Sequence, residues 1–268
     1  MIIATHGILA SAGGIVYDAD AQAFFDRVTA AGGTLSATEK TAVNQLVLDM
    51  KSYSIWTAMK AIYPMVGASA AACAQNLKSS SFTGTFNGGW TFASTGATPN
   101  GTTGYMDTGL TPSTELNVNS NGIGFYTSRA NSENKSDVVN MGSFAGATQS
   151  AIILYNQSNN YNARLNGNSG IATENGLKGF FHAYRQSNTV TSTFNNSTKK
   201  NTFNSGGTLP NWKVFIGNTS LNSNSPYADG YTTNDFRFAF IGNGLTDTEA
   251  NNFYTAVQAF QTTLSRQV

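Results

Sequence analysis

The chain has 268 residues, a formal net charge of +1 and a charged fraction of only 11%, and its 30 Asn, 26 Ser and 33 Thr residues fill a third of its positions. This balance argues against binding nucleic acid or an anionic membrane through a basic field, because neutralising phosphates requires clustered Lys and Arg. No apolar stretch approaches the roughly 20 residues that span a bilayer. With 17 Phe, 11 Tyr and 3 Trp, the chain has enough apolar surface for one main folded domain.

The opening residues and the cysteine count indicate where the chain folds. Residues 1–7 carry no positive region of the kind that begins a secretory signal. Cys73 is the single cysteine, which excludes an intrachain disulfide framework and a multi-cysteine zinc site. We therefore expect folding in a reducing cytoplasm, followed by release.

Residues 18–64 have helical periodicity. After a cap at Asp18, apolar residues recur with helical spacing, and Gly32 and Gly33 end that run. Residues 36–39 form a capping box that begins a second helix. A short third helix, stopped by Pro64, is predicted from residue 56 onward. The apolar stripes of the three helices are Ala21, Phe24, Phe25 and Val28; Val43, Leu46, Val47 and Met50; and Trp56, Met59, Ile62 and Tyr63.

Residues 65–81 are small and mildly apolar and are expected to form a connector. From residue 82 to about 245, short runs rich in aromatic and β-branched residues alternate with Gly, Asn and Ser, which is typical of a β-sandwich. The predicted strands are 86–94, 104–111, 123–130, 138–145, 150–156, 161–166, 179–186, 189–195, 212–218 and 236–242. Six Asn-Gly pairs suit tight hairpin turns and antiparallel pairing, and they begin at Asn87, Asn100, Asn121, Asn166, Asn175 and Asn243.

The chain is predicted to end in a helix. Residues 246–249 form a second capping box, and one apolar stripe continues for four turns. The expected organisation is a leader over 1–17 that takes part in attachment, a helical segment and connector over 18–81, a jelly-roll β-sandwich over 82–245, and a terminal helix over 246–268 that packs on the sandwich or on a partner.

Catalytic chemistry finds little support. A glycoside hydrolase usually needs two carboxylates about 5 to 10 Å apart. Glu39 and Glu249 are instead cap residues, and the other three glutamates, Glu115, Glu133 and Glu174, fall in predicted loops. The two histidines, His6 and His182, lie in the leader and on a predicted strand, where a histidine is more often a sheet residue than a general base. Cys73 has no neighbouring histidine in the sequence, which favours a structural thiol. We predict no catalytic residue and no cofactor.

Binding chemistry leaves two options open. A surface calcium ion held by loop carbonyls with Asp107, Asp229 or Asp235 is a minor alternative to having no metal site. Aromatic rings beside amide side chains stack on and hydrogen-bond sugars, although most rings of such a chain belong to its core or to a subunit interface. The candidate glycan contacts are Trp90, Trp212, Tyr227 and Tyr231, with Tyr155 and Tyr161 in similar surroundings.

Three stretches carry a family resemblance. Residues 35–64, with Leu35-Ser36-Ala37-Thr38-Glu39-Lys40 and Tyr63-Pro64, resemble the helical lead-in of a group of tailed-phage virion proteins that includes those of crAss-like phages. Residues 86–110 resemble the opening strands of their concanavalin A-like, laminin-G-like jelly roll. Residues 242–267 are similar to the closing strand and terminal helix. The acidic catalytic strand of the glucanase relatives and the calcium-binding acidic cluster of legume lectins have no counterpart here.

The resemblance implies a mainly β fold, a concanavalin A-like jelly-roll sandwich with N-terminal helices and a C-terminal helix. It also implies a non-enzymatic structural component of a phage virion: a head decoration, a head fibre or a tail protein. The expected partners are other virion proteins and further copies of the chain, with a trimer as the expected symmetry. The protein would be made in the host cytoplasm and become extracellular after lysis. The alternatives are an adhesion module that binds host-surface glycan and a divergent glycoside hydrolase.

Overall fold

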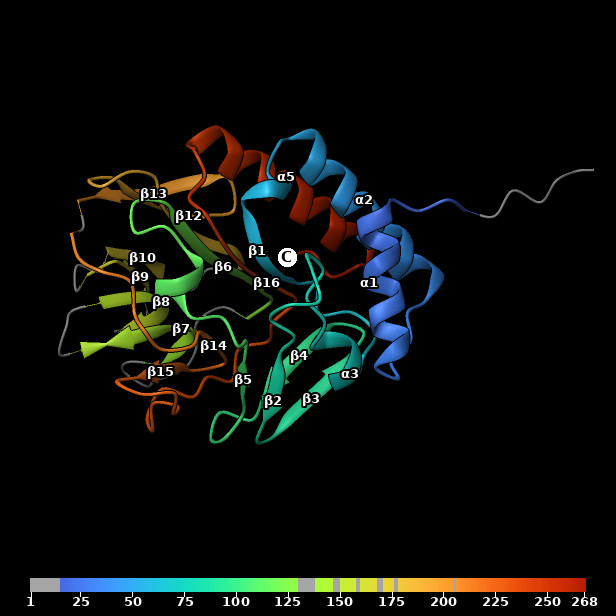
Figure 1. Cartoon of the computed structure of the whole chain (residues 1–268), viewed down its shortest axis with the longest axis horizontal. Coiled ribbons are helices and arrows are strands. Elements are labelled where there is room, and N and C mark those ends of the chain that lie inside the picture. Colours follow the sequence, from blue (N-terminus) through green and yellow to red (C-terminus); the bar gives the residue numbers. More distant parts are fainter. Residues whose placement is uncertain are drawn as a thin grey trace, which may run out of the picture.

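The fold is a mainly β sandwich with helices from both ends of the chain packed on one side (Figure 1). The computed structural model describes residues 15–129, 138–146, 150–157, 160–167, 171–175, 178–204 and 206–268. Two sheets stack face to face, and nearly all strand pairs are antiparallel. The expected jelly-roll sandwich with N-terminal helices and a C-terminal helix is confirmed. None of the helices in the described part of the chain is long and apolar enough to cross a membrane.

Two N-terminal helices form as predicted. Helix α1 spans Ala19–Ala30, and the Asp18 side chain accepts a hydrogen bond from its first turn. Helix α2 spans Ala37–Ser52 and begins with the complete capping box, in which Ser36 and Glu39 each accept from the other's backbone N–H. Lys51 pairs with Asp18 at 2.7 Å. The start of α1 is thereby fixed to the end of α2.

The predicted third helix over residues 56–63 is wrong. Its first residues form a single 3-10 turn, Trp56–Ala58, and the chain then continues as strand β1, Met59–Tyr63. In this strand Ile62 packs toward the helices, whereas Ala61 and Tyr63 pack between the sheets. A bulge lies between Met59 and Ala61. The turn followed by a bulged strand spaces the apolar residues as a helix would, so periodicity alone could not separate the two.

The six-stranded sheet is buried on both faces except at its edge strand β13 (Thr198–Phe203), which is mostly exposed. Its inner face packs against the other sheet through residues such as Phe125 and Phe181, and its outer face packs against helices through residues such as Tyr126 and Phe240. Strand β1 forms one edge of this sheet. Residues 18–81, which were predicted to be a helical segment and connector, therefore contribute a strand to the sandwich. The spatial order is β1, β16 (Phe238–Gly242), β6 (Asn121–Thr127), β11 (Gly179–Arg185), β12 (Thr191–Asn195) and β13.

The second sheet has eight strands. Its spatial order is β10 (Ile171–Asn175), β9 (Asn160–Leu165), β8 (Ser150–Gln157), β7 (Val139–Ala145), β14 (Phe215–Ile216), β5 (Tyr105–Asp107) and β2 (Thr85–Asn87), and β15 (Thr219–Leu221) pairs with β7 in parallel.

Several strand predictions need correction. The predicted strand 86–94 divides into β2 and β3 (Trp90–Ala93), and β3 pairs with β4 (Gly96–Pro99) as a separate hairpin. The predicted strand 212–218 contains only the two-residue β14. The predictions also missed β4, β10, β13 and β15. Strand β13 was missed because most of its side chains are polar and exposed at the sheet edge.

The Asn-Gly pairs do not all form hairpin turns. The pair at Asn121 lies inside β6, where Gly122 leaves room for the ring of Tyr184. At the pair beginning with Asn100, the side-chain oxygen accepts from three backbone N–H groups of the following residues. The pair at Asn175 extends outside the described residues. The hairpin between β12 and β13 turns instead at Asn196, which has a positive φ of 54°.

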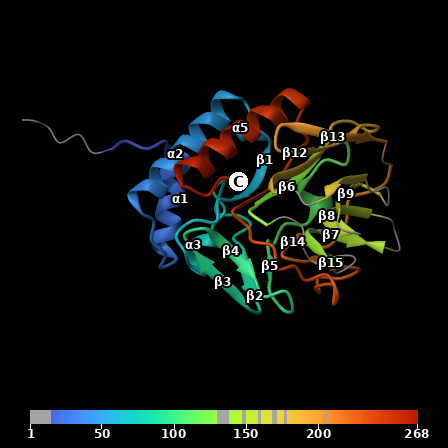
Figure 2. The same cartoon turned by 180° about the vertical axis from the view of Figure 1, so that it is seen from behind.

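The C-terminal helix α5, Asp247–Thr263, covers the outer face of the six-stranded sheet next to α2, as two opposite views show (Figures 1 and 2). Thr246 and Glu249 form the second predicted capping box. Phe253 contacts the sheet residue Phe240 with ring centroids 4.9 Å apart. The outer face of the six-stranded sheet is therefore closed by helices. Two short helices complete the fold, α3 (Ala70–Cys73) in the expected connector and α4 (Pro112–Glu115).

The tail after α5 is held by the buried Arg266. Its guanidinium donates to the carbonyl oxygens of Met65 at 2.7 Å, Arg237 at 2.8 Å and Pro64 at 3.2 Å, and to the Gln261 side chain at 2.9 Å. Burial lowers the pKa of Arg266 to about 10, so the group stays charged at neutral pH. These bonds connect the tail to the end of β1 and to the segment before β16.

Candidate functional site

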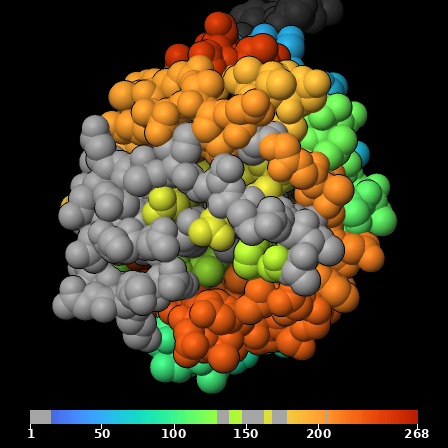
Figure 3. Space-filling model, turned by 90° about the vertical axis from the view of Figure 1, so that its left-hand side faces the viewer, coloured from blue at the N-terminus to red at the C-terminus, as the bar shows by residue number. Residues whose placement is uncertain are grey.

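The predicted glycan contacts lie around one segment, residues 217–231, which runs beside β7 and β14. Tyr227 and Tyr231 belong to this segment and are half-buried. Trp212 precedes β14, and its carbonyl oxygen accepts a hydrogen bond from Ser143 at 2.7 Å. In Figure 3 the orange-red residues near 212–230 form the lower rim of the face toward the viewer.

Trp90 lies at the edge of this region but packs inward. Its ring contacts Phe86 with centroids 4.9 Å apart and also lies near Phe92 and Phe236. The indole N–H donates to the Asn87 carbonyl at 3.1 Å. Most of the Trp90 ring therefore belongs to the apolar cluster between the sheet and the β3–β4 hairpin.

Sequence reasoning missed Tyr105 as a site residue. It lies on β5 next to Met106, whose side chain enters the core, so the pleat directs Tyr105 away from the core. Its ring covers Phe215 of β14 at a centroid distance of 4.8 Å. Only the pairing of β5 with β14 reveals this position, and no local sequence signal marks it.

We define the aromatic loop surface as the half-buried rings of Tyr105, Trp212, Tyr227 and Tyr231. The Lys213 amide next to Trp212 donates to Asn224 at 2.9 Å. Desolvation, with a smaller electrostatic contribution from Tyr105, raises the pKa of Tyr231 and keeps its hydroxyl protonated. The four rings thus combine apolar faces with polar groups of the neighbouring loop.

Buried amide groups hold the segment in place. Asn218 is fully buried, accepts from the Thr219 amide at 2.6 Å and donates to the Tyr227 carbonyl at 3.0 Å. Asn234 donates to the buried Asn140 side chain on β7 at 2.8 Å. Bonds that fix a loop before binding lower the entropy cost of ordering it on a ligand. The aromatic loop surface is therefore preorganised.

One ion pair lies next to this surface. Lys213 contacts Asp107 with an N–O distance of 2.9 Å, and the Asp107 carboxylate also accepts from the Gly109 amide at 2.8 Å. This pairing leaves the region between β5 and β14 close to neutral.

The three carboxylates considered for the minor alternative of a surface calcium ion lie in different surroundings. Asp107 pairs with Lys213, and Asp235 pairs with Arg237 at 2.8 Å. Asp229 is exposed on the loop. Within the described residues, no three His, Cys, Asp or Glu side chains come together to hold a metal ion.

The groups considered for catalysis have structural contacts. Glu39 and Glu249 cap helices, as predicted. Burial lowers the pKa of His182 to about 3, and its ring contacts the Tyr184 hydroxyl at 3.0 Å and the Asn196 carbonyl at 2.9 Å, so it is a satisfied sheet histidine. Burial raises the pKa of the Cys73 thiol to about 12. Glu115 lies at the end of α4, whereas Glu133, the Glu174 side chain and His6 lie outside the described residues.

No family model and no curated protein matches the chain. Among solved structures, the botulinum neurotoxin serotype D binding domain is similar with a TM-score of 0.51 and 10% identity, over 75% of this chain and 52% of that domain. Domain 4 of AbnA, a GH43 extracellular arabinanase from Geobacillus stearothermophilus solved with arabinotriose, gives 0.46 and 11%, over 73% and 97%. The chain thus spans about half of the toxin domain. At these identities the likeness concerns the fold alone.

Proposed function

We propose that the chain is a non-enzymatic binding module whose ligand-binding face is the aromatic loop surface. The observation that carries this proposal is the contrast between the two sheets. Helices close the outer face of the six-stranded sheet, whereas the region around β5, β7 and β14 presents half-buried rings on a segment fixed by buried amides. Half-buried rings on a preorganised loop are typical of recognition surfaces.

The proposed ligand is an oligosaccharide of a host surface. Aromatic rings offer an apolar face to the C–H groups of a sugar, and tyrosine hydroxyls and loop amides exchange hydrogen bonds with its hydroxyls. Four separate rings, Tyr105, Trp212, Tyr227 and Tyr231, offer more apolar area than a single sugar unit covers. Lys213 is paired with Asp107, and the exposed carboxylate of Asp229 on the same segment disfavours an anionic ligand.

The proposed location is the surface of a phage virion, as a head decoration, head fibre or tail protein. The resemblance of the helical lead-in, the opening strands and the terminal helix to tailed-phage virion proteins supports this placement. Ile15 and Val16, just before α1, are 71% and 92% exposed, which suits contact with a neighbouring virion protein or another copy of the chain. In this arrangement the leader attaches the module and the aromatic loop surface faces outward.

A glycan array tests the binding proposal. Wild-type protein should bind a defined set of neutral oligosaccharides, and Tyr227→Ala should weaken that binding at least tenfold because it removes a stacking ring. Tyr254→Ala is the matched control, because Tyr254 is also a half-buried tyrosine but lies on α5. The same oligosaccharides should remain uncleaved on long incubation. Equal losses in both variants, or turnover of a bound glycan, would contradict the proposal.

A reconstruction of the particle tests the proposed location. The chain should occupy fixed, repeated positions, with α1 toward the particle and residues 217–231 toward solvent. Absence of the chain from purified virions would contradict a virion role. The glycan array would still test the binding proposal on its own.

A further inference from the structure

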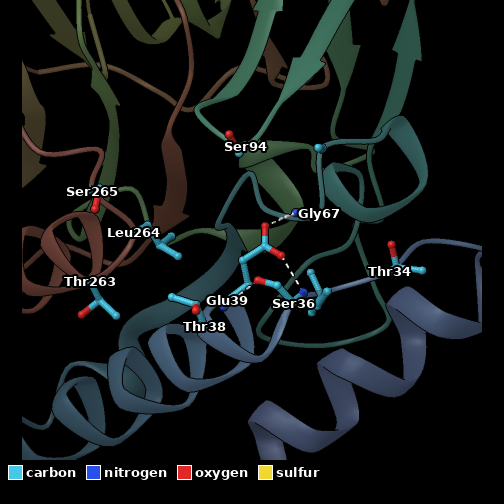
Figure 4. A pocket seen from close by; sticks show the side chains of 11 residues that line it. Thr34, Ser36, Thr38, Glu39, Gly67, Ser94, Thr263, Leu264 and Ser265 are labelled. Atoms are coloured by element: carbon cyan, nitrogen blue, oxygen red, sulfur yellow. Dashed lines mark hydrogen bonds between the residues drawn. The ribbon is translucent and has the colours of Figure 1, made fainter.

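A pocket of about 610 Å³ opens in the helical part of the molecule (Figure 4). Four segments that are distant in the sequence form it: residues 34–39 at the start of α2, residues 67–68, the β3–β4 turn at Ser94, and residues 263–265 at the end of α5. Its volume lies within the range of about 300–1,000 Å³ that is typical of small-molecule sites. The pocket shares no residue with the aromatic loop surface.

The only ionisable side chain that lines the pocket is Glu39, and both of its oxygens are engaged. One accepts from the Ser36 amide at 2.8 Å and the other from the Gly67 amide at 2.7 Å. Figure 4 shows these bonds from the α2 side of the pocket. Glu39 raises the pKa of the buried Arg266, but Arg266 does not line the pocket. Glu39 would repel an anion, because no cationic side chain among the described residues lines the pocket. A cation would have to compete for the carboxylate with the two N–H groups that already donate to it.

The two helix ends that border the pocket have opposite partial charges. The N-terminus of α2 contributes a positive end, and the C-terminus of α5 contributes a negative end. Their electrostatic potentials partly cancel in the opening, so the helix ends select neither a cation nor an anion. The electrostatics of the pocket therefore favour a neutral, polar ligand.

Hydroxyl groups and two leucines complete the lining. Thr34, Thr38, Ser94 and Ser265 line the open side of the pocket as exposed residues, and no residue in the described part of the chain hydrogen-bonds their side-chain hydroxyls. Each hydroxyl has one donor and two acceptor lone pairs. Leu35 and Leu264 add apolar contact between these groups. Free hydroxyls interspersed with apolar surface complement a molecule that carries both hydroxyl and C–H groups.

We propose that this pocket binds a neutral polyhydroxylated ligand, one or two sugar units in size. The hydroxyls of Thr38 and Ser94 would exchange hydrogen bonds with the ligand from opposite sides, and Leu35 and Leu264 would contact its C–H face. This site is additional to the aromatic loop surface of the proposed function and does not depend on it.

An NMR titration tests this site in the full chain. Methyl glucoside, methyl galactoside and maltose are the neutral probes, and glucuronate and glucosamine are the charged comparators. We expect a neutral probe to shift the backbone amide signals of Gly67, Thr38 and Ser94 with millimolar affinity, and the charged comparators to bind at least fivefold more weakly. No shifts with any neutral probe at 100 mM, or stronger binding of glucuronate, would overturn the proposal.

A matched pair of double variants locates the binding. Thr38→Ala with Ser94→Ala removes two lining hydroxyls and should weaken binding at least tenfold. Thr41→Ala with Thr91→Ala makes comparable changes on α2 and on the hairpin at exposed positions outside the pocket, and should leave the affinity within twofold. Equal affinities of the two double variants would overturn the site. Tyr227→Ala should leave these shifts unchanged. The pocket can therefore be tested even if the aromatic loop surface binds no glycan.

Discussion

Helices α2 and α5 cover the outer face of the six-stranded sheet, whereas the segment 217–231 runs beside the strands of the eight-stranded sheet. Under the helices, aromatic rings such as Phe240 and Phe253 are fully buried. Beside the segment, rings such as Tyr227 and Tyr231 stay half-buried, and buried amides such as Asn218 hydrogen-bond the backbone of the segment. The comparison teaches that apolar packing stabilises one side, while hydrogen bonds position a surface on the other. Substitutions on the two sides should therefore have different consequences.

The largest effect is expected under the helices. Phe253→Ala removes a fully buried ring that contacts Phe180, Phe238 and Phe240, and it should lower the free energy of unfolding by about 3–5 kcal/mol. Thr255→Ala, on the exposed face of the same helix, should change it by less than about 0.5 kcal/mol. Urea unfolding measures both. Similar values for the two variants would contradict an apolar interface between α5 and the sheet.

The same buried layer should be sensitive to acid through His182. Its pKa is about 3 in the folded chain because burial disfavours the charged ring, whereas an unfolded histidine has a pKa near 6.5. As the pH falls below 6.5, the unfolded chain takes up the proton first, so the folded state loses stability relative to it. The free energy of unfolding should fall by about 2 kcal/mol between pH 7 and pH 5 from this group.

His182→Gln is the control for that prediction, because it removes the titrating group. Between pH 7 and pH 5, the unfolding free energy of this variant should fall by about 2 kcal/mol less than that of the wild type. NMR provides a second readout that does not depend on the stability of the variant. The His182 ring signals should show no titration between pH 7 and pH 5, and a midpoint near pH 6.5 would contradict a buried neutral ring.

Two glycines beside the eight-stranded sheet, one inside and one outside the 217–231 segment, allow a smaller comparison. Gly217 has a φ of 85°, and an added Cβ would lie 3.1 Å from the Gly104 carbonyl oxygen and 3.2 Å from the Trp90 ring. Gly109 has a φ of 71° with nothing within 4 Å. Gly109→Ala should cost about 1 kcal/mol from backbone strain alone, and Gly217→Ala about 2 kcal/mol. Thermal unfolding that ranks them in the reverse order would show that the 217–231 segment is not tightly fitted.

The smallest effect is expected at the half-exposed pair of Lys213 and Asp107. Lys213→Met should change the free energy of unfolding by less than about 1 kcal/mol, because such pairs are screened by water. If the ligand is neutral, its affinity should change less than threefold in the same variant. A large loss of affinity would indicate a charged ligand and would contradict the proposed ligand class.

Local signals in the sequence predicted local structure well. The capping boxes at residues 36–39 and 246–249 were found because their hydrogen bonds join residues three positions apart. The prediction of a third helix was wrong because a 3-10 turn followed by the bulged strand β1 spaces the apolar residues as a helix would. The polar edge strand β13 has no apolar alternation to detect.

The two proposed binding surfaces depend on contacts between distant parts of the chain. Tyr227 and Tyr231 were predicted as glycan contacts because aromatic and amide residues are neighbours in the sequence, and this role stays a prediction. Tyr105 comes into the same region only through the pairing of β5 with β14. The pocket between the start of α2 and the end of α5 combines four separate segments, so no single motif could predict it.

Hydrogen exchange with and without the best-bound array oligosaccharide tests the central claim most directly, because it reports where a ligand orders the chain. The account predicts that added protection falls on residues 212–231 and on β5, while α1, α2 and α5 exchange as before. Protection of the helices without any change at residues 212–231 would contradict the assignment of the aromatic loop surface as the ligand-binding face.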